Sequence, residues 1–321
     1  MRDHGGNLDQ AIARFGGDPA DWIDLSTGIN RRPYPVPTLP PEAWTALPTG
    51  AAKRALTEAA ARAYGTGAAI LALAGAQAAI QMIPRLLPCG TARVLSPTYN
   101  EHAATLRAAG WTVEEVDTLS DLPGANLAVV VNPNNPDGRD HRPEALLDLA
   151  GRVGTLVVDE SFADPLPHLS LAAQAGQPGL FLLRSFGKFY GLAGLRLGFV
   201  IGAEDAIETL SAMAGPWPVS GAAIEIGRRA LADRNWADET TARLLGETAR
   251  LDAMAGAAGW AVRGGSPLFR LYETPDATAA QDRLAMAQIW TRRFPYSPTW
   301  LRLGLPGDDA EWQRLDHALR A

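Results

Sequence analysis

The sequence has a single cysteine, few histidines and no excess of positive charge. Because Cys89 is the only cysteine, the chain can form neither an intramolecular disulfide nor a cluster of thiolate metal ligands. The five histidines lack the spacing typical of a zinc site, and we expect no bound metal. Basic residues number 29 and acidic residues 35, which argues against a broad contact with nucleic acid. One cysteine fits a reducing compartment, and we expect a cytoplasmic protein.

The sequence also lacks long hydrophobic runs and complete nucleotide-binding motifs. The most apolar stretch, Ala68 to Ile83, is interrupted by two glutamines and is short for a bilayer span, so we expect no membrane partner. The first ten residues carry charges and no apolar core, unlike a secretory signal. Gly65-Thr66-Gly67 lacks the third glycine of a dinucleotide fingerprint, and Gly187-Lys188 is followed by phenylalanine. These gaps argue against a nucleotide-binding or regulatory domain.

Short apolar runs and helical patterns alternate from about Lys53 onward. This alternation is typical of parallel strands joined by helical crossovers and predicts an α/β fold. The predicted strands are Ala69 to Leu73, Arg93 to Leu95, Leu127 to Val131, Thr155 to Val158, Leu180 to Leu183 and Arg196 to Ile201. The predicted helices between them are Ala76 to Leu87, Glu101 to Ala109 and Pro143 to Arg152.

The pattern changes after Gly202. A long helix is predicted from about Trp236 to Ala258, followed by strands near Leu268 to Tyr272 and Trp300 to Leu305, which indicates a smaller α+β domain. Proline fixes its own backbone angle, so the proline-rich stretch Arg31 to Pro48 predicts an extended arm. We predict a large domain over residues 45–205 and a small domain that combines residues 206–321 with the N-terminal arm, residues 1–44.

Two charged groups stand at the ends of predicted strands, where open α/β sheets bind ligands. Lys188, in Ser185-Phe186-Gly187-Lys188, precedes Arg196 by eight residues, and this grouping suits an amine that forms an imine beside a phosphate. A surface lysine is the alternative. Asp159 ends a buried strand and should face a cation such as a protonated pyridine. A helix cap or a magnesium ligand are the alternatives for Asp159.

Three further segments add weaker signals of the same kind. Asn135 lies in a loop rich in asparagine, proline and glycine, which is usually only a turn but would let its amide donate to a phenolic oxygen. Gly75-Ala76-Gln77 opens a predicted helix and would present backbone donors to a phosphate. Tyr99 would stack on a pyridine ring, although core packing is the commoner role of such an aromatic side chain.

Longer motifs around these residues resemble a known family. "SFGKFYGLAGLRLG" with Lys188, "VVDESF" with Asp159, "NPNNPDG" with Asn135 and "SPTY" with Tyr99 are similar to the fold-type-I, class I/II aminotransferase superfamily over nearly the whole chain. Within it, three segments resemble the threonine-phosphate decarboxylases of cobalamin synthesis. These are "HGGN" at residues 4–7, "DLSTGIN" at 24–30 and "GPWPVSGAAIEIGRRAL" at 215–231.

The resemblance implies a fold, a cofactor and a reaction. The fold would have a mainly parallel seven-stranded sheet flanked by helices, with a smaller α+β domain, and the protein would be a homodimer. The cofactor would be pyridoxal 5'-phosphate. The substrate would be a small phosphorylated amino acid, L-threonine O-3-phosphate, decarboxylated to (R)-1-amino-2-propanol O-2-phosphate. The nearest alternative is an aminotransferase of the histidinol-phosphate type, which needs much the same site.

The resemblance also implies roles for individual residues. Lys188 would form the Schiff base, Asp159 would pair with the pyridinium, Asn135 would donate to the phenolic oxygen and Tyr99 would stack on the ring. The cofactor phosphate would be held by Ser185, Arg196 and the segment Gly75, Ala76 and Gln77. The substrate would be bound by Arg302 in "WLRLGLP", by Asn135, and by His4, Asn30 and Arg292, which match regions near the substrate's phosphate or carboxylate.

The sequence departs from the family pattern at three places. Gly187 stands where many relatives have serine or threonine, which removes one phosphate hydroxyl. Phe162 replaces a tyrosine near the phenolic oxygen. "LPT" at residues 47–49 replaces a "YPD" whose tyrosine reaches the cofactor of the neighbouring subunit. Because the residues at these positions have no equivalent hydroxyl groups for the cofactor, the sequence defines the phosphate cup less well than it defines Lys188 and Asp159.

Overall fold

The computed structural model describes residues 4–320 and divides into two compact units. One unit comprises Met1–Pro33, Pro136–Gly138 and Asp238–Ala321, and the other comprises Tyr34–Asn135 and Arg139–Ala237. The predicted domain division at residues 44/45 and 205/206 stays a prediction, and residues 1–3 and 321 of the predicted small domain lie outside the described part of the chain. No helix among residues 4–320 combines the length and the apolarity that crossing a membrane requires.

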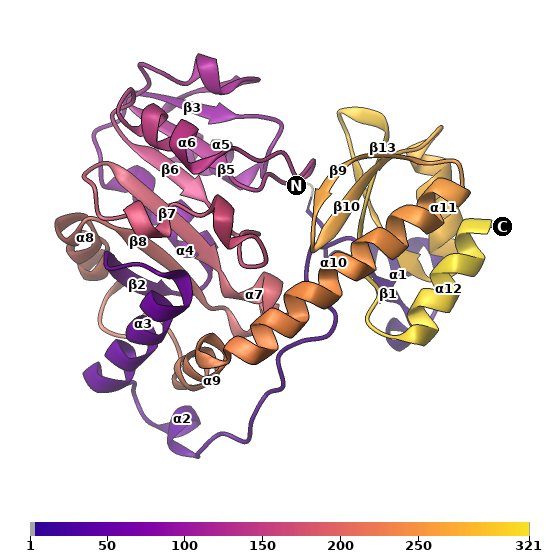
Figure 1. Ribbon diagram of the computed structural model, residues 1–321, viewed down its shortest axis with the longest axis horizontal. Helices are drawn as coiled ribbons and strands as arrows, with labels where there is room; N and C mark the ends of the chain where they lie inside the picture. The colour runs from indigo at the N-terminus through magenta and orange to yellow at the C-terminus, as the bar shows by residue number, and fades with distance from the viewer. Residues whose placement is uncertain (1–3, 321) are drawn as a thin grey trace. The chain divides into compact units, whose positions relative to one another are not determined.

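The larger unit is built on a seven-stranded sheet (Figure 1). Its strand order is β2 (Ala69–Leu73), β8 (Gly198–Gly202), β7 (Leu180–Ser185), β6 (Leu156–Asp159), β5 (Leu127–Val131), β3 (Thr91–Leu95) and β4 (Thr112–Val116). Only β8 runs antiparallel to its neighbours, β2 and β7. The predicted α/β class and mainly parallel sheet are therefore confirmed.

Edge strand β4 was not predicted from the sequence. Its segment, Thr-Val-Glu-Glu-Val, is largely exposed and carries two charged residues, so it lacks the apolar run that marks the buried strands. Helix α4 (Ala76–Met82) is shorter than predicted. It continues only as a 3₁₀ turn over Ile83–Arg85, because Pro84 has no N–H to donate to an α-helical hydrogen bond.

Helices cover both faces of the sheet. On one face, α4, α5 (Glu101–Ala108) and α8 (Glu204–Ala214) pack against alternate strand residues such as Val129 and Val157. On the other face, α6 (Pro143–Ala150) packs against Val130 and Val158. Each fully buried aliphatic side chain contributes about 1.5–3 kcal/mol. This two-sided burial fixes the strands firmly, and their carboxyl ends become a rigid platform.

This unit also contains four other helices. They are α2 (Glu42–Thr45), α3 (Gly50–Tyr64), α7 (Phe186–Phe189) and α9 (Gly221–Ala232). Helix α3 begins at Thr49, whose side chain accepts a hydrogen bond from the amide of Ala52, and ends at Gly65 in the left-handed conformation. The predicted arm, residues 31–48, is extended in part, and α2 is a single helical turn within it.

The smaller unit has a four-stranded antiparallel sheet in the order β12 (Arg292–Phe294), β13 (Ser297–Gly304), β10 (Phe269–Glu273) and β9 (Ala261–Ser266). A short parallel pair joins β1 (Ile23–Asp24) to β11 (Ile289–Trp290). Its helices are α1 (Leu8–Phe15), α11 (Ala277–Met286), α12 (Asp309–Arg320) and most of α10 (Arg234–Ala257). The predicted smaller α+β part is confirmed.

Candidate active site

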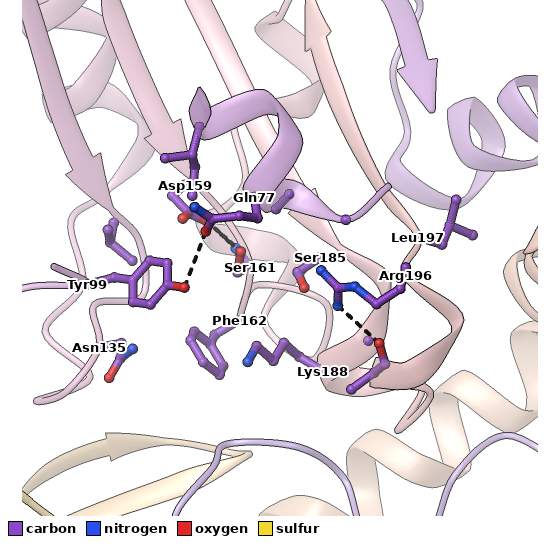
Figure 2. Close-up of a pocket in the computed structure, with 16 residues that line it drawn as sticks. Gln77, Tyr99, Asn135, Asp159, Ser161, Phe162, Ser185, Lys188, Arg196 and Leu197 are labelled. Atoms are coloured by element: carbon purple, nitrogen blue, oxygen red, sulfur yellow. Dashed lines mark hydrogen bonds between the residues drawn. The ribbon is translucent and has the colours of Figure 1, made fainter. Parts of the chain in front are cut away.

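A cavity opens at the carboxyl ends of β5, β6 and β7, beside the start of α4, within the larger unit (Figure 2). Tyr99 and Asn135 lie on one side of it and Ser185 and Arg196 on the other, with Lys188 between them. The lining residues are Gly75, Ala76, Gln77, Ile80, Tyr99, Val131, Asn135, Asp159, Ser161, Phe162, Ser185, Gly187, Lys188, Ala193, Arg196 and Leu197. The structure thus brings all nine predicted cofactor residues to one cavity.

Asp159 is the last residue of β6 and is almost fully buried. One carboxylate oxygen accepts hydrogen bonds from the Ser161 amide at 3.0 Å and hydroxyl at 2.5 Å, and the other lies 2.9 Å from His102 Nε2. Burial pushes the pKa of Asp159 upward, but the hydrogen bonds and charge of His102, together with Ser161, outweigh it and lower that pKa. The carboxylate is therefore ionised, and its remaining lone pairs can accept one more donor from the cavity.

Sequence reasoning missed His102. It lies on α5 and is 57 positions away from Asp159 in the chain, so no local motif joins the two. The available signal was its place three residues after Tyr99, which puts the imidazole on the first turn of a helix that starts beside the predicted site. The Tyr99 and His102 rings meet edge to face, with centroids 6.1 Å apart.

Lys188 lies on α7, the single helical turn that directly follows β7. The chain has only two lysines, and the other, Lys53, donates to the Pro216 carbonyl. The ammonium nitrogen of Lys188 lies 5.5 Å from the centre of the buried Phe162 ring. The phenylalanine that replaces the family's tyrosine thus supplies an apolar, electron-rich face next to the amine.

Arg196 lies on the opposite side of the cavity from Asn135 (Figure 2), and its guanidinium lies next to Gly75. A Cβ atom on Gly75 would lie 2.6 Å from Arg196 Nη2, and the φ angle of Gly75, +81°, also favours glycine. Arg196 itself has a φ of 54°, a conformation that non-glycine residues rarely adopt, and its Nη1 donates to the Ala193 carbonyl. With Ser185 at the end of β7, these groups form a cationic corner that suits an anion such as phosphate.

The packing of this chain explains why position 187 is a glycine. A Cβ atom there would lie 2.8 Å from the Cα atom of Ala193, closer than real side chains approach backbone. A serine or threonine at this position would therefore require the turn after α7 to move. The close packing of Ala193 takes the space that the family hydroxyl would occupy.

Polar side chains hold the two loops that carry Tyr99 and Asn135. The Tyr99 hydroxyl donates to Gln77 Oε1, and Gln77 Nε2 donates to Glu101. Asn134, the neighbour of Asn135, donates to the Pro97 carbonyl and accepts from the Thr98 hydroxyl at 2.6 Å. These bonds join the loop after β3 to the loop after β5. These bonds therefore hold the loop of Tyr99, the predicted ring-stacking residue, next to the loop of Asn135, the predicted amide donor.

The other predicted substrate residues, His4, Asn30, Arg292 and Arg302, belong to the smaller unit. His4 and Arg292 line one hollow of this unit, together with Arg14 and Arg293. Arg302 is buried and donates to the Ser26 carbonyl at 2.7 Å. Asn30 is buried and accepts from the Arg32 amide and the Arg243 guanidinium. Arg302 and Asn30 do not line the hollow that contains His4.

Comparison with known proteins identifies the family of this chain. The model of the aminotransferase class I and II family matches residues 39–319. A threonine-phosphate decarboxylase from Pseudomonas aeruginosa is 45% identical, over 99% of this chain and 97% of that protein. A second one, from a Sinorhizobium species, is also 45% identical, over 98% of this chain and 97% of that protein.

A solved structure adds a likeness in fold. The histidinol-phosphate aminotransferase from Sinorhizobium meliloti, in complex with pyridoxal 5'-phosphate, has a TM-score of 0.80 at 21% identity and covers all of this chain and 95% of that one. The chain belongs to the class I and II aminotransferase family and, within it, groups with the threonine-phosphate decarboxylases.

Proposed function

We propose that this chain is a pyridoxal-phosphate enzyme that decarboxylates L-threonine O-3-phosphate to (R)-1-amino-2-propanol O-2-phosphate. The observation that carries the cofactor assignment is the placement of an amine, a buried ionised carboxylate and a guanidinium around one cavity, by Lys188, Asp159 and Arg196. The 45% identity to two threonine-phosphate decarboxylases over almost the full chain supports the choice of reaction.

The residues present fit pyridoxal phosphate. Asp159 is a buried carboxylate with room for one further donor, which the protonated ring nitrogen would supply. Arg196, Ser185 and the backbone of Ala76 and Gln77 would hold the phosphate. When bound, pyridoxal phosphate supplies an aldehyde that reacts with amines and a ring that accepts the electrons of a broken bond.

Four residues of the cavity then have proposed tasks that follow from their chemistry. Lys188 would supply the amine that holds the cofactor and would return a proton to the substrate's α-carbon. Asp159 would keep the ring nitrogen protonated, because a negative charge beside it raises that nitrogen's pKa. Asn135 would donate to the phenolic oxygen, and Tyr99 would cover one face of the ring.

The residues that bind and orient the substrate determine which of its bonds breaks. For decarboxylation, the residues that bind the substrate would have to hold its carboxylate so that the bond between the carboxylate and the α-carbon is the one that the bound cofactor would weaken. We propose that Arg302 binds an acidic group of the substrate, as the resemblance to the family arginine implies. We propose the same for His4, Asn30 and Arg292, which match regions near the substrate's phosphate or carboxylate. Arginines suit this task because their planar guanidinium pairs with two oxygens at once.

The second candidate is an aminotransferase of the histidinol-phosphate type. The fold match to such an enzyme favours it, but at 21% identity this likeness concerns the fold alone. Purified protein is incubated with O-phosphothreonine, with and without 2-oxoglutarate. We expect carbon dioxide release that does not depend on 2-oxoglutarate. Glutamate formation without carbon dioxide would favour the aminotransferase instead.

We also propose that the active form is a cytoplasmic homodimer. The larger unit exposes several large apolar side chains around α2 and the turn before α9, and such exposure is typical of a surface that a partner covers. They are Val36, Trp44, Leu47, Met213 and Trp217, which are 43–68% exposed. The α2 carbonyl of Ala43 packs closely on Gly221 at the start of α9, so Trp44 and Trp217 belong to neighbouring segments.

Light scattering should give twice the chain mass, and Trp44→Glu should lower the measured mass.

A further inference from the structure

A buried ion network lies beside the catalytic strands and has no place in the reaction described above. Arg184 Nη1 donates to Glu160 Oε2 at 2.8 Å, and its Nη2 donates to Asp164 Oδ1 at 3.2 Å. The three side chains are 0–7% exposed. The guanidinium also lies over the ring of Tyr64, 4.2 Å from its centre.

The sequence puts this network directly behind the active site. Glu160 follows Asp159, and Arg184 precedes Ser185 and lies four residues before Lys188. Successive residues of a strand point to opposite sides of the sheet. Asp159 and Ser185 line the cavity, whereas Glu160 and Arg184 do not, so the ion pair joins the ends of β6 and β7 away from the cavity.

The bonding of Glu160 extends this connection along the chain. Its amide donates to the Leu183 carbonyl of β7. Its carboxylate accepts from the Leu171 amide at 2.7 Å and from the Ser170 hydroxyl at 2.6 Å. One side chain therefore ties the segment after Asp159 to β7 and to residues 170–171. Both carboxylate oxygens are satisfied, which a buried charge requires.

Stability alone does not account for such a network. Taking three charges out of water costs about as much as their attraction returns, and apolar residues of similar volume often stabilise a core as well. Burial raises the pKa of Asp164, Arg184 opposes this rise and Glu160 adds to it. The network keeps two carboxylates beside one guanidinium, an arrangement that specifies geometry rather than maximal stability.

We propose that Arg184, Glu160 and Asp164 are positioning residues that set where Asp159 and Lys188 stand with respect to the bound cofactor. This inference rests on the proposed roles of Asp159 and Lys188. The network touches neither cofactor nor substrate and acts through the strand ends. Loosening it would change the alignment of the carboxylate with the ring nitrogen, and hence the proton affinity of the cofactor, before it unfolds the protein.

The test compares Glu160→Gln and the milder Asp164→Asn with the wild type as holoenzymes. The readouts are the pH midpoint of the cofactor's visible absorbance and kcat per bound cofactor. For Glu160→Gln we expect a midpoint shift of roughly half a unit or more and a kcat about tenfold lower, with KM changed less. Asp164→Asn should move both readouts the same way by a smaller amount, because it leaves the bond between Arg184 and Glu160 intact.

Asp252→Asn is the matched control. Asp252 receives two guanidinium bonds from Arg270 and one from the Tyr272 hydroxyl, all within the smaller unit. The Asp252→Asn substitution should lower the melting temperature without changing the pH midpoint of the cofactor's absorbance. If Asp164→Asn and any folded Glu160→Gln keep the wild-type midpoint and kcat, the positioning role is wrong. Borohydride trapping at Lys188 in the wild type is measured alongside, and its failure would instead overturn the proposed function.

Discussion

Replacing Asp159 by asparagine tests the electrostatic part of the site while keeping its shape. The asparagine amide is close in size to the carboxylate and still has an oxygen that can accept from Ser161, so the fold should persist. The change removes one buried negative charge that faces the cavity. The new amide nitrogen, which only donates, then faces His102 Nε2, so this contact requires the imidazole tautomer that accepts at Nε2.

The magnitude follows from the burial of that charge. Two unit charges in contact attract each other by about 4 kcal/mol at an effective dielectric constant of about 20. An asparagine oxygen keeps part of this attraction, so roughly 3 kcal/mol of transition-state stabilisation should be lost, which is a fall in kcat of about 10²-fold. The assay is carbon dioxide release from O-phosphothreonine at saturating cofactor. Glu114→Gln, on the exposed edge strand β4, is the control and should keep the wild-type rate.

The result that would refute this reasoning is a variant that binds the cofactor and keeps kcat within about threefold of the wild type. Such an enzyme would not depend on a charge at position 159. A variant that merely unfolds would show as loss of the cooperative thermal transition, which is recorded on the same samples.

Four further predictions concern single residues of the cavity or its direct contacts. Lys188→Ala should abolish turnover while the apoprotein melts as the wild type does, and residual turnover would count against the covalent role. His102→Leu removes a buried partner of Asp159 and should destabilise the protein by about 1–3 kcal/mol and slow kcat roughly tenfold, measured by urea unfolding and steady-state rates. Gly187→Ser should destabilise by about 1–3 kcal/mol, since its Cβ would meet Ala193, and an unchanged urea midpoint would disprove the clash. The folded-state pKa of Asp159 is below the ordinary value of 3.8, so the carboxylate stabilises the apoprotein fully above pH 3.8 and loses this effect as the pH falls through the lower pKa. The unfolding free energies of wild type and Asp159→Asn should therefore converge only in acid, and convergence near neutral pH would contradict the lowered pKa.

The buried strands could be predicted because their chemistry is local. β5 consists of five fully buried apolar residues, Leu127–Val131, and any sheet with two covered faces requires such a run. β4 could not be predicted, because an exposed edge strand is specified by its neighbour β3 and not by its own hydrophobicity. The helix at Ala76 ends before its apolar pattern does, because Pro84 interrupts the helical hydrogen bonds.

The residues of the candidate site also differ in whether the sequence alone could predict them. Asp159, Asn135, Ser185 and Lys188 all lie within five residues after the end of a predicted strand, and parallel strands bring their carboxyl ends together. His102 could not be assigned, because its contact with Asp159 depends on how α5 packs on the sheet. Because His102 and Asp159 are far apart in the sequence, no short sequence motif contains both residues.

The covalent attachment site tests the central claim most directly. Holoenzyme is reduced with borohydride, digested and mapped by mass spectrometry. Because the chain has only two lysines, the result distinguishes two positions. We predict that the peptide with Lys188 carries the reduced cofactor and that the Lys53 peptide does not. A cofactor adduct on Lys53 alone, or none on either lysine in a protein saturated with pyridoxal phosphate, would contradict the account.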